Sequence, residues 1–119
     1  MHQSLDTLTT EVQQGELITR YAEWDTMAVR HAQVPAGTDF GPVLEGLPGD
    51  RCPSPHWGIV MKGSVHLRHA DGTTVTTRAG DAYFWPAGHT AWTDEDTEFL
   101  EIGPVGPMRQ FHQHVTPDE

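Results

Sequence analysis

The chain has 119 residues and a mass of 13.2 kDa, which is the size of a single ordinary domain. Seven Lys and Arg against 17 Asp and Glu give a formal net charge of −10. This balance argues against binding to DNA, RNA or anionic membranes, because these partners require clustered cations. No apolar run approaches the roughly 20 residues of a membrane-spanning helix. Residues 1–6 lack the basic and apolar regions of a signal peptide. Because Cys52 is the single cysteine, no disulfide can form within the chain, and we expect a cytoplasmic protein.

The N-terminal segment is the one fair candidate for a helix. A helix over residues 4–14 could be capped by Ser4 and ended by Gly15, with leucine and valine on one face. Several Thr and Ser residues lower the helical propensity of this stretch. We therefore expect a short helix or an arm over residues 1–15, followed by one domain over residues 16–119.

From residue 17 onward the sequence has the pattern of short strands joined by turns. Apolar and polar residues alternate, or form short apolar runs such as residues 57–62. Twelve Gly and nine Pro interrupt these runs, and Asp71-Gly72 is typical of a tight hairpin. About eight strands with this spacing predict an all-β antiparallel sandwich or barrel of jelly-roll size. The tail beyond Gly106-Pro107 is expected to be an edge strand or an arm.

Residues 78–88 read Arg-Ala-Gly-Asp-Ala-Tyr-Phe-Trp-Pro-Ala-Gly and resemble the second motif of the cupins, a Gly, five residues and then Pro-x-Gly. The upstream hairpin, residues 56–72, resembles the first cupin motif and the turn between the two. Residues 50–58, with Pro-His-Trp-Gly, and Gly88-His89-Thr90 are similar to a subgroup of short cupins. The resemblance implies a small single-domain bacterial cupin, an antiparallel jelly-roll β-barrel of the RmlC-like superfamily.

The chain departs from the usual cupin ligand pattern of three His and one Glu. Counting back from the closing glycine of the first motif, the Glu position holds His56, and the two His positions hold Asp50 and Cys52. The position of the remaining His holds Ala91, while His89 lies two residues earlier with the same strand parity. The resemblance therefore implies a metal site with a different ligand set, Cys52, His56 and His89, with Asp50 in reserve.

One thiolate and two imidazoles suit Zn²⁺ and are acceptable for Fe²⁺ or Ni²⁺, so we expect a divalent metal, with zinc preferred. Three protein ligands leave an open position for water or substrate, as in catalytic sites. We expect His56 to act in catalysis as well, by moving protons. Each residue also has a purely structural interpretation: Cys52 as a small buried hydrophobe, His56 as a strand-end residue and His89 as a turn residue bonded to the backbone.

Other ionisable residues could join this site or lie outside it. His31 is inward-facing if Met27 and Val29 face the core, and it could then be a fourth ligand. Glu101 lies either on the outer face or inside against His56, and the sequence leaves both alternatives open. The histidines expected outside the site are His66, His69, His112 and His114.

The favoured function is a metal-dependent small-molecule enzyme of isomerase, cyclase, lyase or dioxygenase type, with its pocket in the barrel mouth. The alternative is a metal-free cupin that binds or senses a small molecule, and a third possibility is a dimeric scaffold with a vestigial pocket. Open sheet edges and the β-branched residues of segment 5–18 favour a homodimer. Neither nucleic acid nor membrane is expected as a partner.

Overall fold

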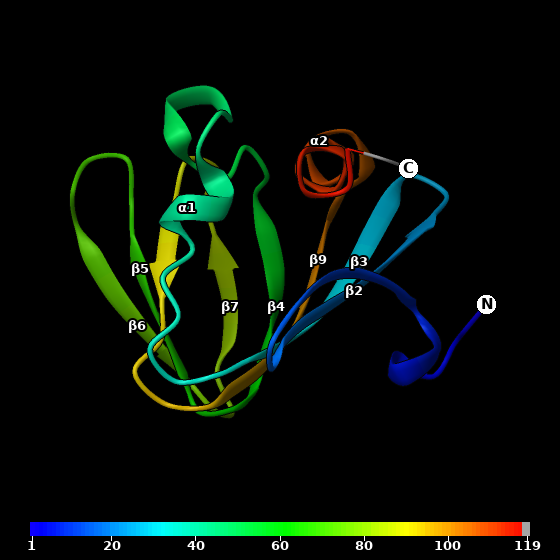
Figure 1. Cartoon of the computed structure of the whole chain (residues 1–119), viewed down its shortest axis with the longest axis horizontal. Coiled ribbons are helices and arrows are strands. Elements are labelled where there is room, and N and C mark those ends of the chain that lie inside the picture. Colours follow the sequence, from blue (N-terminus) through cyan, green and yellow to red (C-terminus); the bar gives the residue numbers. More distant parts are fainter. Residues whose placement is uncertain (118–119) are drawn as a thin grey trace.

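The structure is a computed structural model and describes residues 1–117. Within these residues, the chain forms a six-stranded sheet of order β1-β2-β3-β9-β4-β7 and a three-stranded sheet of order β6-β5-β8 (Figure 1). The strands are β1 (Thr9–Gln14), β2 (Leu17–Trp24), β3 (Met27–Val34), β4 (His56–Lys62), β5 (Ser64–Arg68), β6 (Thr74–Arg78), β7 (Ala82–Trp85), β8 (Thr90–Trp92) and β9 (Thr97–Pro104). The helices are η1 (Leu5–Thr7) and η2 (Pro48–Asp50), both 3₁₀, and the α-helices α1 (Gly41–Leu44) and α2 (Val105–Val115).

The strand pairings explain how the barrel forms. Every pair of neighbouring strands runs antiparallel, so the prediction of an all-β antiparallel fold is confirmed. The core lies between the two sheets, where Val60 of β4 meets Val65 and Leu67 of β5, all without exposed surface. Trp85 and Phe99 fill the space between these aliphatic side chains. Inward residues of adjacent strands therefore form one continuous apolar interior.

Gly63 makes the sharp turn from β4 into β5 possible. Its φ is +74°, in the left-handed region that favours glycine. A Cβ at this position would also collide with the backbone carbonyl of Asp96 and with Thr97. The closing glycine of the first motif is therefore required both by its backbone conformation and by the close approach of the chain before β9.

The N-terminal segment is helical over a shorter stretch than the candidate over residues 4–14. Only η1 is helical, and residues 9–14 form β1, an edge strand paired with β2. Thr9, Thr10 and Val12 are β-branched and favour a strand, and β2 provides backbone partners that local propensity does not reveal. The division into an arm over residues 1–15 and a domain over residues 16–119 stays a prediction.

The expectation of an edge strand or arm at the C-terminal end is wrong, because Val105–Val115 forms helix α2. Pro107 lies in the first turn, where a backbone N–H has no intrahelical acceptor, so proline is tolerated. Met108 and Phe111, three residues apart, share one face and are buried against the barrel. Figure 1 shows α1 and α2 at the same end of the two sheets. No helix in the described part of the chain is both long and apolar enough to cross a membrane.

We predict that α2 contributes substantially to the stability of the barrel. Met108 has no exposed surface, so Met108→Ala should lower the free energy of unfolding by about 2–5 kcal/mol, measured by urea denaturation. The matched control is Met27→Ala, because Met27 is 39% exposed and its loss should cost about 0.5 kcal/mol or less. Equal effects of the two substitutions would contradict the packing of α2.

Candidate functional site

The backbone brings Cys52 and His89 together. The Cys52 N–H donates a 2.9 Å hydrogen bond to the carbonyl of His89, and the Gly88 N–H donates a 2.7 Å bond to the carbonyl of Cys52. His56 is the first residue of β4 and lies opposite Trp85 of β7. Pairing between distant segments thus places the three side chains at the end of the barrel near α1 and α2.

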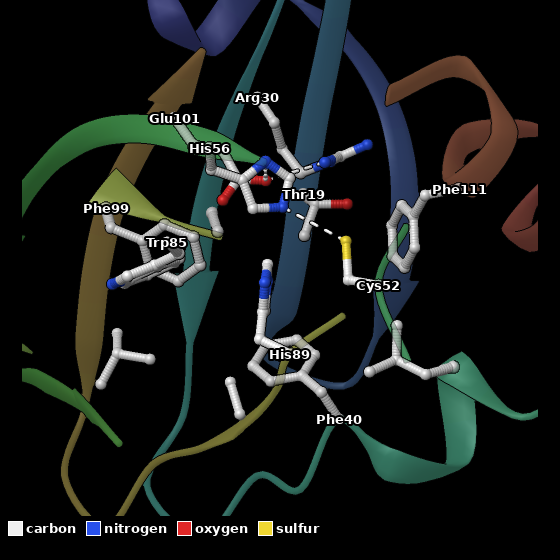
Figure 2. A pocket seen from close by; sticks show the side chains of 14 residues that line it. Thr19, Arg30, Phe40, Cys52, His56, Trp85, His89, Phe99, Glu101 and Phe111 are labelled. Atoms are coloured by element: carbon white, nitrogen blue, oxygen red, sulfur yellow. Dashed lines mark hydrogen bonds and ion pairs between the residues drawn. The ribbon is translucent and has the colours of Figure 1, made fainter. Parts of the chain in front are cut away.

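The three predicted metal ligands converge on one point. One ligand atom each from Cys52, His56 and His89 lies within 4.8 Å of the other two, and all three residues are buried. Cys52 Sγ is 3.2 Å from His56 Nε2, and the two imidazole ring centroids are 5.0 Å apart. Figure 2 shows the thiol and the two rings pointing toward one another. That these residues hold a metal stays a prediction.

Hydrogen bonding orients the two imidazoles differently. Nδ1 of His89 donates a 2.7 Å bond to the carbonyl of Pro86, which accepts only, so Nε2 keeps its lone pair. Nδ1 of His56 is buried without a hydrogen-bond partner. It lies 3.6 Å from Oε2 of Glu101, which is too long for a hydrogen bond. The contact of His56 is thus through Nε2 with Cys52, whereas that of His89 is through Nδ1 with the backbone.

Burial keeps all three candidate ligands uncharged. Loss of solvation lowers the pKa of His56 to about 3, with a further contribution from Arg30. Loss of solvation and the proximity of His56 lower the pKa of His89 to about 4. Burial raises the pKa of the Cys52 thiol to about 12. At neutral pH the imidazoles are therefore ready to donate lone pairs, whereas the thiol is protonated and a poor nucleophile.

A buried ionic network lies behind His56. Arg30 Nε and Nη2 donate to the two carboxylate oxygens of Glu11 at 2.7 and 3.0 Å, and Nη1 donates to Glu101 Oε2 at 2.8 Å. Glu11 also accepts a bond from Thr19 and lies 2.7 Å from Nδ1 of His112 on α2. The network therefore joins β1, β2, β3, β9 and α2.

The charges of this network stabilise one another. Burial opposes ionisation of Glu11, yet Arg30 and His112 hold its pKa at about 2. Burial likewise disfavours the Arg30 cation, but the carboxylates of Glu11 and Glu101 raise its pKa above the ordinary value. Burial raises the pKa of Glu101, against the opposing effect of Arg30. The two acidic groups thus differ, with Glu11 the more firmly ionised.

A small cavity adjoins the candidate ligands. Its volume is about 60 Å³, room for roughly four water molecules. Its polar wall carries Cys52, His56, His89, Arg30 and Glu101, and the remaining lining is almost entirely apolar (Figure 2). The apolar lining residues are Ala32, Phe40, Leu44, Val65, Trp85, Ala91, Phe99 and Phe111.

His31 does not join the site, and the expected orientation of its strand is wrong. Arg30 and Ala32 line the cavity, so His31 points to the opposite face, where Nε2 lies 2.7 Å from Glu98 Oε2. β3 pairs with β2 and β9 and is buried on both faces. Alternation of apolar residues cannot identify the inner face of such a strand.

The other sequence candidates divide between the cavity and the surface. Glu101 lines the cavity beside His56, which settles the alternatives that the sequence leaves open. Asp50 is exposed and accepts a bond from the Gly46 N–H, so it is not a reserve ligand in this structure. The four histidines expected outside the site do not belong to the cluster: they are His66, His69, His112 and His114.

Sequence reasoning missed Arg30 and Glu11. A charged residue inside an otherwise apolar stretch signals a buried ion pair, since burial is tolerated only with an oppositely charged partner. The partner of Arg30 could not be identified from this signal, because Glu11 and Glu101 are 19 and 71 residues away in the chain.

Comparison with known proteins supports the fold. No protein-family model and no curated protein matches the chain. A conserved protein with a double-stranded β-helix domain from Klebsiella pneumoniae superposes with a TM-score of 0.63 at 18% identity, covering 88% of this chain and 84% of that one. A conserved protein of unknown function from Streptococcus pyogenes gives 0.59 at 16% identity, covering 77% and 76%. Oxalate decarboxylase from Bacillus subtilis gives 0.60 at 15% identity, covering 85% of this chain but 28% of the enzyme. The chain therefore has the double-stranded β-helix fold.

Proposed function

We propose that the protein is a metal-dependent enzyme that acts on a small molecule, with Cys52, His56 and His89 as the ligands of a divalent metal. The observation that carries this proposal is the convergence of three buried donor atoms within 4.8 Å beside a cavity. Zinc suits one thiolate and two imidazoles, and iron or nickel are the alternatives. The thiolate needs a reducing environment, which is consistent with a cytoplasmic location.

The donor set fits a zinc ion with a modest adjustment. Bonds of about 2.0–2.3 Å around a tetrahedral ion bring ligand atoms to about 3.5 Å from one another. Cys52 Sγ and His56 Nε2 are already 3.2 Å apart, and the widest pair of ligand atoms lies within 4.8 Å, so a contraction of about 1 Å is required. The unprotonated Nε2 of His89 faces the group because its Nδ1 is bonded to Pro86.

The protein supplies orientation and proton-transfer groups around this site. When bound, such a metal polarises a substrate oxygen or lowers the pKa of a bound water. Nδ1 of His56 faces the Glu101 carboxylate, so these two side chains are the groups we assign to proton transfer. The walls of the cavity away from the candidate ligands are apolar, and an apolar surrounding strengthens electrostatic interactions. Isomerase, cyclase, lyase and dioxygenase chemistry all remain within this proposal.

One observation favours a metal-free cupin that binds or senses a small molecule. The Cys52 thiol can donate to Nε2 of His56 across 3.2 Å, so the two residues satisfy each other without a cation. In that case, the same cavity would hold a ligand and no reaction would follow. Metal analysis separates the two functions.

We predict that protein purified without a His-tag retains about one divalent metal ion per chain after dialysis. Cys52→Ser, His56→Ala and His89→Ala should each weaken binding by more than about 100-fold, since loss of even an outer-shell partner typically costs 10–100-fold. The readout is metal content by mass spectrometry and titration with Co²⁺, whose thiolate charge-transfer band reports on Cys52. His66→Ala, on the smaller sheet, is the control and should bind normally. All four variants should keep a cooperative thermal transition, and metal-free wild-type protein would support the binding function instead.

We also predict the pH dependence of metal affinity. Above about pH 6 both imidazoles are already neutral, with pKa values of about 3 and 4, whereas the thiol pKa is about 12. Binding should therefore release one proton, and affinity should rise about tenfold per pH unit between about pH 6 and 8. Competition titrations across this range measure the slope. A slope near zero would show that the Cys52 thiolate is not a ligand.

We further propose a homodimer that forms through the outer face of the six-stranded sheet. Trp57 of β4 lies directly between Phe84 of β7 and Ile102 of β9, and the Trp57 and Phe84 rings are 4.9 Å apart. These residues and Ile59 are 41–52% exposed. Together they expose roughly 350 Å² of apolar surface, close to half of the about 800 Å² that each partner buries in a stable dimer.

A second copy of the chain suits this surface because the patch carries no charge. The chain as a whole has a net charge of −10, so most other faces of two copies repel each other. A two-fold contact would bury the patch around Trp57 against itself. β1 is the edge strand next to β2, and the proposed contact uses the outer face of the sheet, not this edge.

We predict that Ile59→Lys converts the dimer to a monomer, because it buries a charge within the contact. Val75→Lys is the matched control, since Val75 lies on the smaller sheet and is 44% exposed, against 42% for Ile59. Analytical ultracentrifugation measures both variants. A wild-type mass of one chain at micromolar concentration would overturn the proposed dimer.

A further inference from the structure

We infer that the cavity beside Cys52, His56 and His89 takes a small uncharged molecule and rejects carboxylates, and that Glu101 is the residue that determines this preference. The inference rests on the proposed function only in treating this cavity as the ligand pocket. It does not require that a metal is bound. An uncharged ligand would set this chain apart from oxalate decarboxylase, which shares its fold and takes its name from a carboxylate, oxalate.

The first argument is that the single cationic side chain in the cavity wall is already neutralised. Among the described residues that line the cavity, Arg30 is the only Lys or Arg. Its Nε, Nη1 and Nη2 all donate to carboxylate oxygens at 2.7–3.0 Å, two to Glu11 and one to Glu101. An incoming carboxylate would therefore meet a guanidinium whose charge is already balanced by two buried carboxylates, so it would gain little attraction in return for losing its own hydration.

The second argument is the balance of charge. Arg30 pairs with the carboxylates of Glu11 and Glu101, and Glu11 also lies 2.7 Å from Nδ1 of His112, so each cationic or imidazole group of the network already faces a carboxylate. Without a metal, the network therefore holds no unpaired positive charge that would attract an anion.

The third argument is size and polarity. A cavity of about 60 Å³ admits roughly four non-hydrogen atoms, if each takes the space of a water molecule. Its walls away from the candidate ligands are apolar, with Phe40, Trp85 and Phe111 among them. A molecule that suits this cavity has one polar atom, which faces Cys52, His56 and His89, and an apolar remainder, which contacts the apolar lining.

The test compares acetone with acetate, two planar probes with the same number of non-hydrogen atoms and nearly the same shape. NMR of metal-free protein follows the indole N–H of Trp85, which lines the cavity and donates to Thr77 at 3.1 Å. We expect acetone to shift this resonance in a saturable manner, with a Kd in the millimolar range or above, and acetate to cause no saturable shift at neutral pH. Ala91→Leu, which fills the cavity, should abolish the effect of acetone.

The role of Glu101 is tested with Glu101→Gln, which keeps the shape of the side chain and removes its charge. Acetate should then bind at least about tenfold more tightly than to wild-type protein, because Arg30 Nη1 then faces a neutral amide in place of a carboxylate group. Glu98→Gln is the matched control: Glu98 lies on the same strand but pairs with His31 on the outer face. This control should leave acetate binding unchanged.

The outcomes separate this inference from the proposed function. Saturable binding of acetate to wild-type protein, or no binding of acetone, would overturn the preference for an uncharged ligand whatever the metal content. If Glu101→Gln folds and does not gain acetate binding, Glu101 does not determine the preference. If it does not fold, the wild-type pair of probes and Ala91→Leu still decide the preference. Loss of metal binding alone would overturn only the metal-dependent function.

Discussion

The buried contact of Arg30 with Glu11 and Glu101 is the constraint on which the rest of the structure depends. Removing an ion from water costs several kcal/mol unless a partner of opposite charge compensates it. Arg30 is fully paired only when β1 supplies Glu11 and β9 supplies Glu101. Because His112 of α2 also contacts Glu11, the position of the C-terminal helix is tied to the same pair. The floor of the cavity and the element that covers it are therefore set by one ionic network.

This network also defines the electrostatic character of the candidate site. Glu101 places a carboxylate 3.6 Å from Nδ1 of His56, while Arg30 helps to keep that imidazole neutral. Burial has opposite consequences for the two kinds of ligand, because it makes the imidazoles available and keeps the Cys52 thiol protonated. The site can thus either bind a cation that displaces the proton of the Cys52 thiol, or keep the hydrogen bond between this thiol and His56.

Similarity of fold and similarity of site are separate properties in this protein. Solved structures with 15–18% identity share its two-sheet architecture, which many unrelated activities use. The candidate ligands are Cys52, His56 and His89, a set that differs from the usual cupin pattern of three His and one Glu. Function must therefore be argued from this cavity and its charges rather than from the fold.

The sequence by itself determined the short strands and the turns, because turns at residues such as Gly63 are local features. The convergence of the three candidate ligands was predicted from the resemblance of two motifs to those of the cupins. The sequence did not determine the helix α2, the inner face of β3 or the role of Arg30. Pro107 was compatible with either a break or a first helical turn, and a strand buried on both faces has no alternation to interpret. Glu11 and Glu101 approach Arg30 only after the sheet has formed, since they lie 19 and 71 residues from it in the chain. The local pattern thus specifies strands and turns. The partners of a buried charge are decided by the tertiary structure, because only the folded chain removes that charge from water and makes an unpaired ion costly.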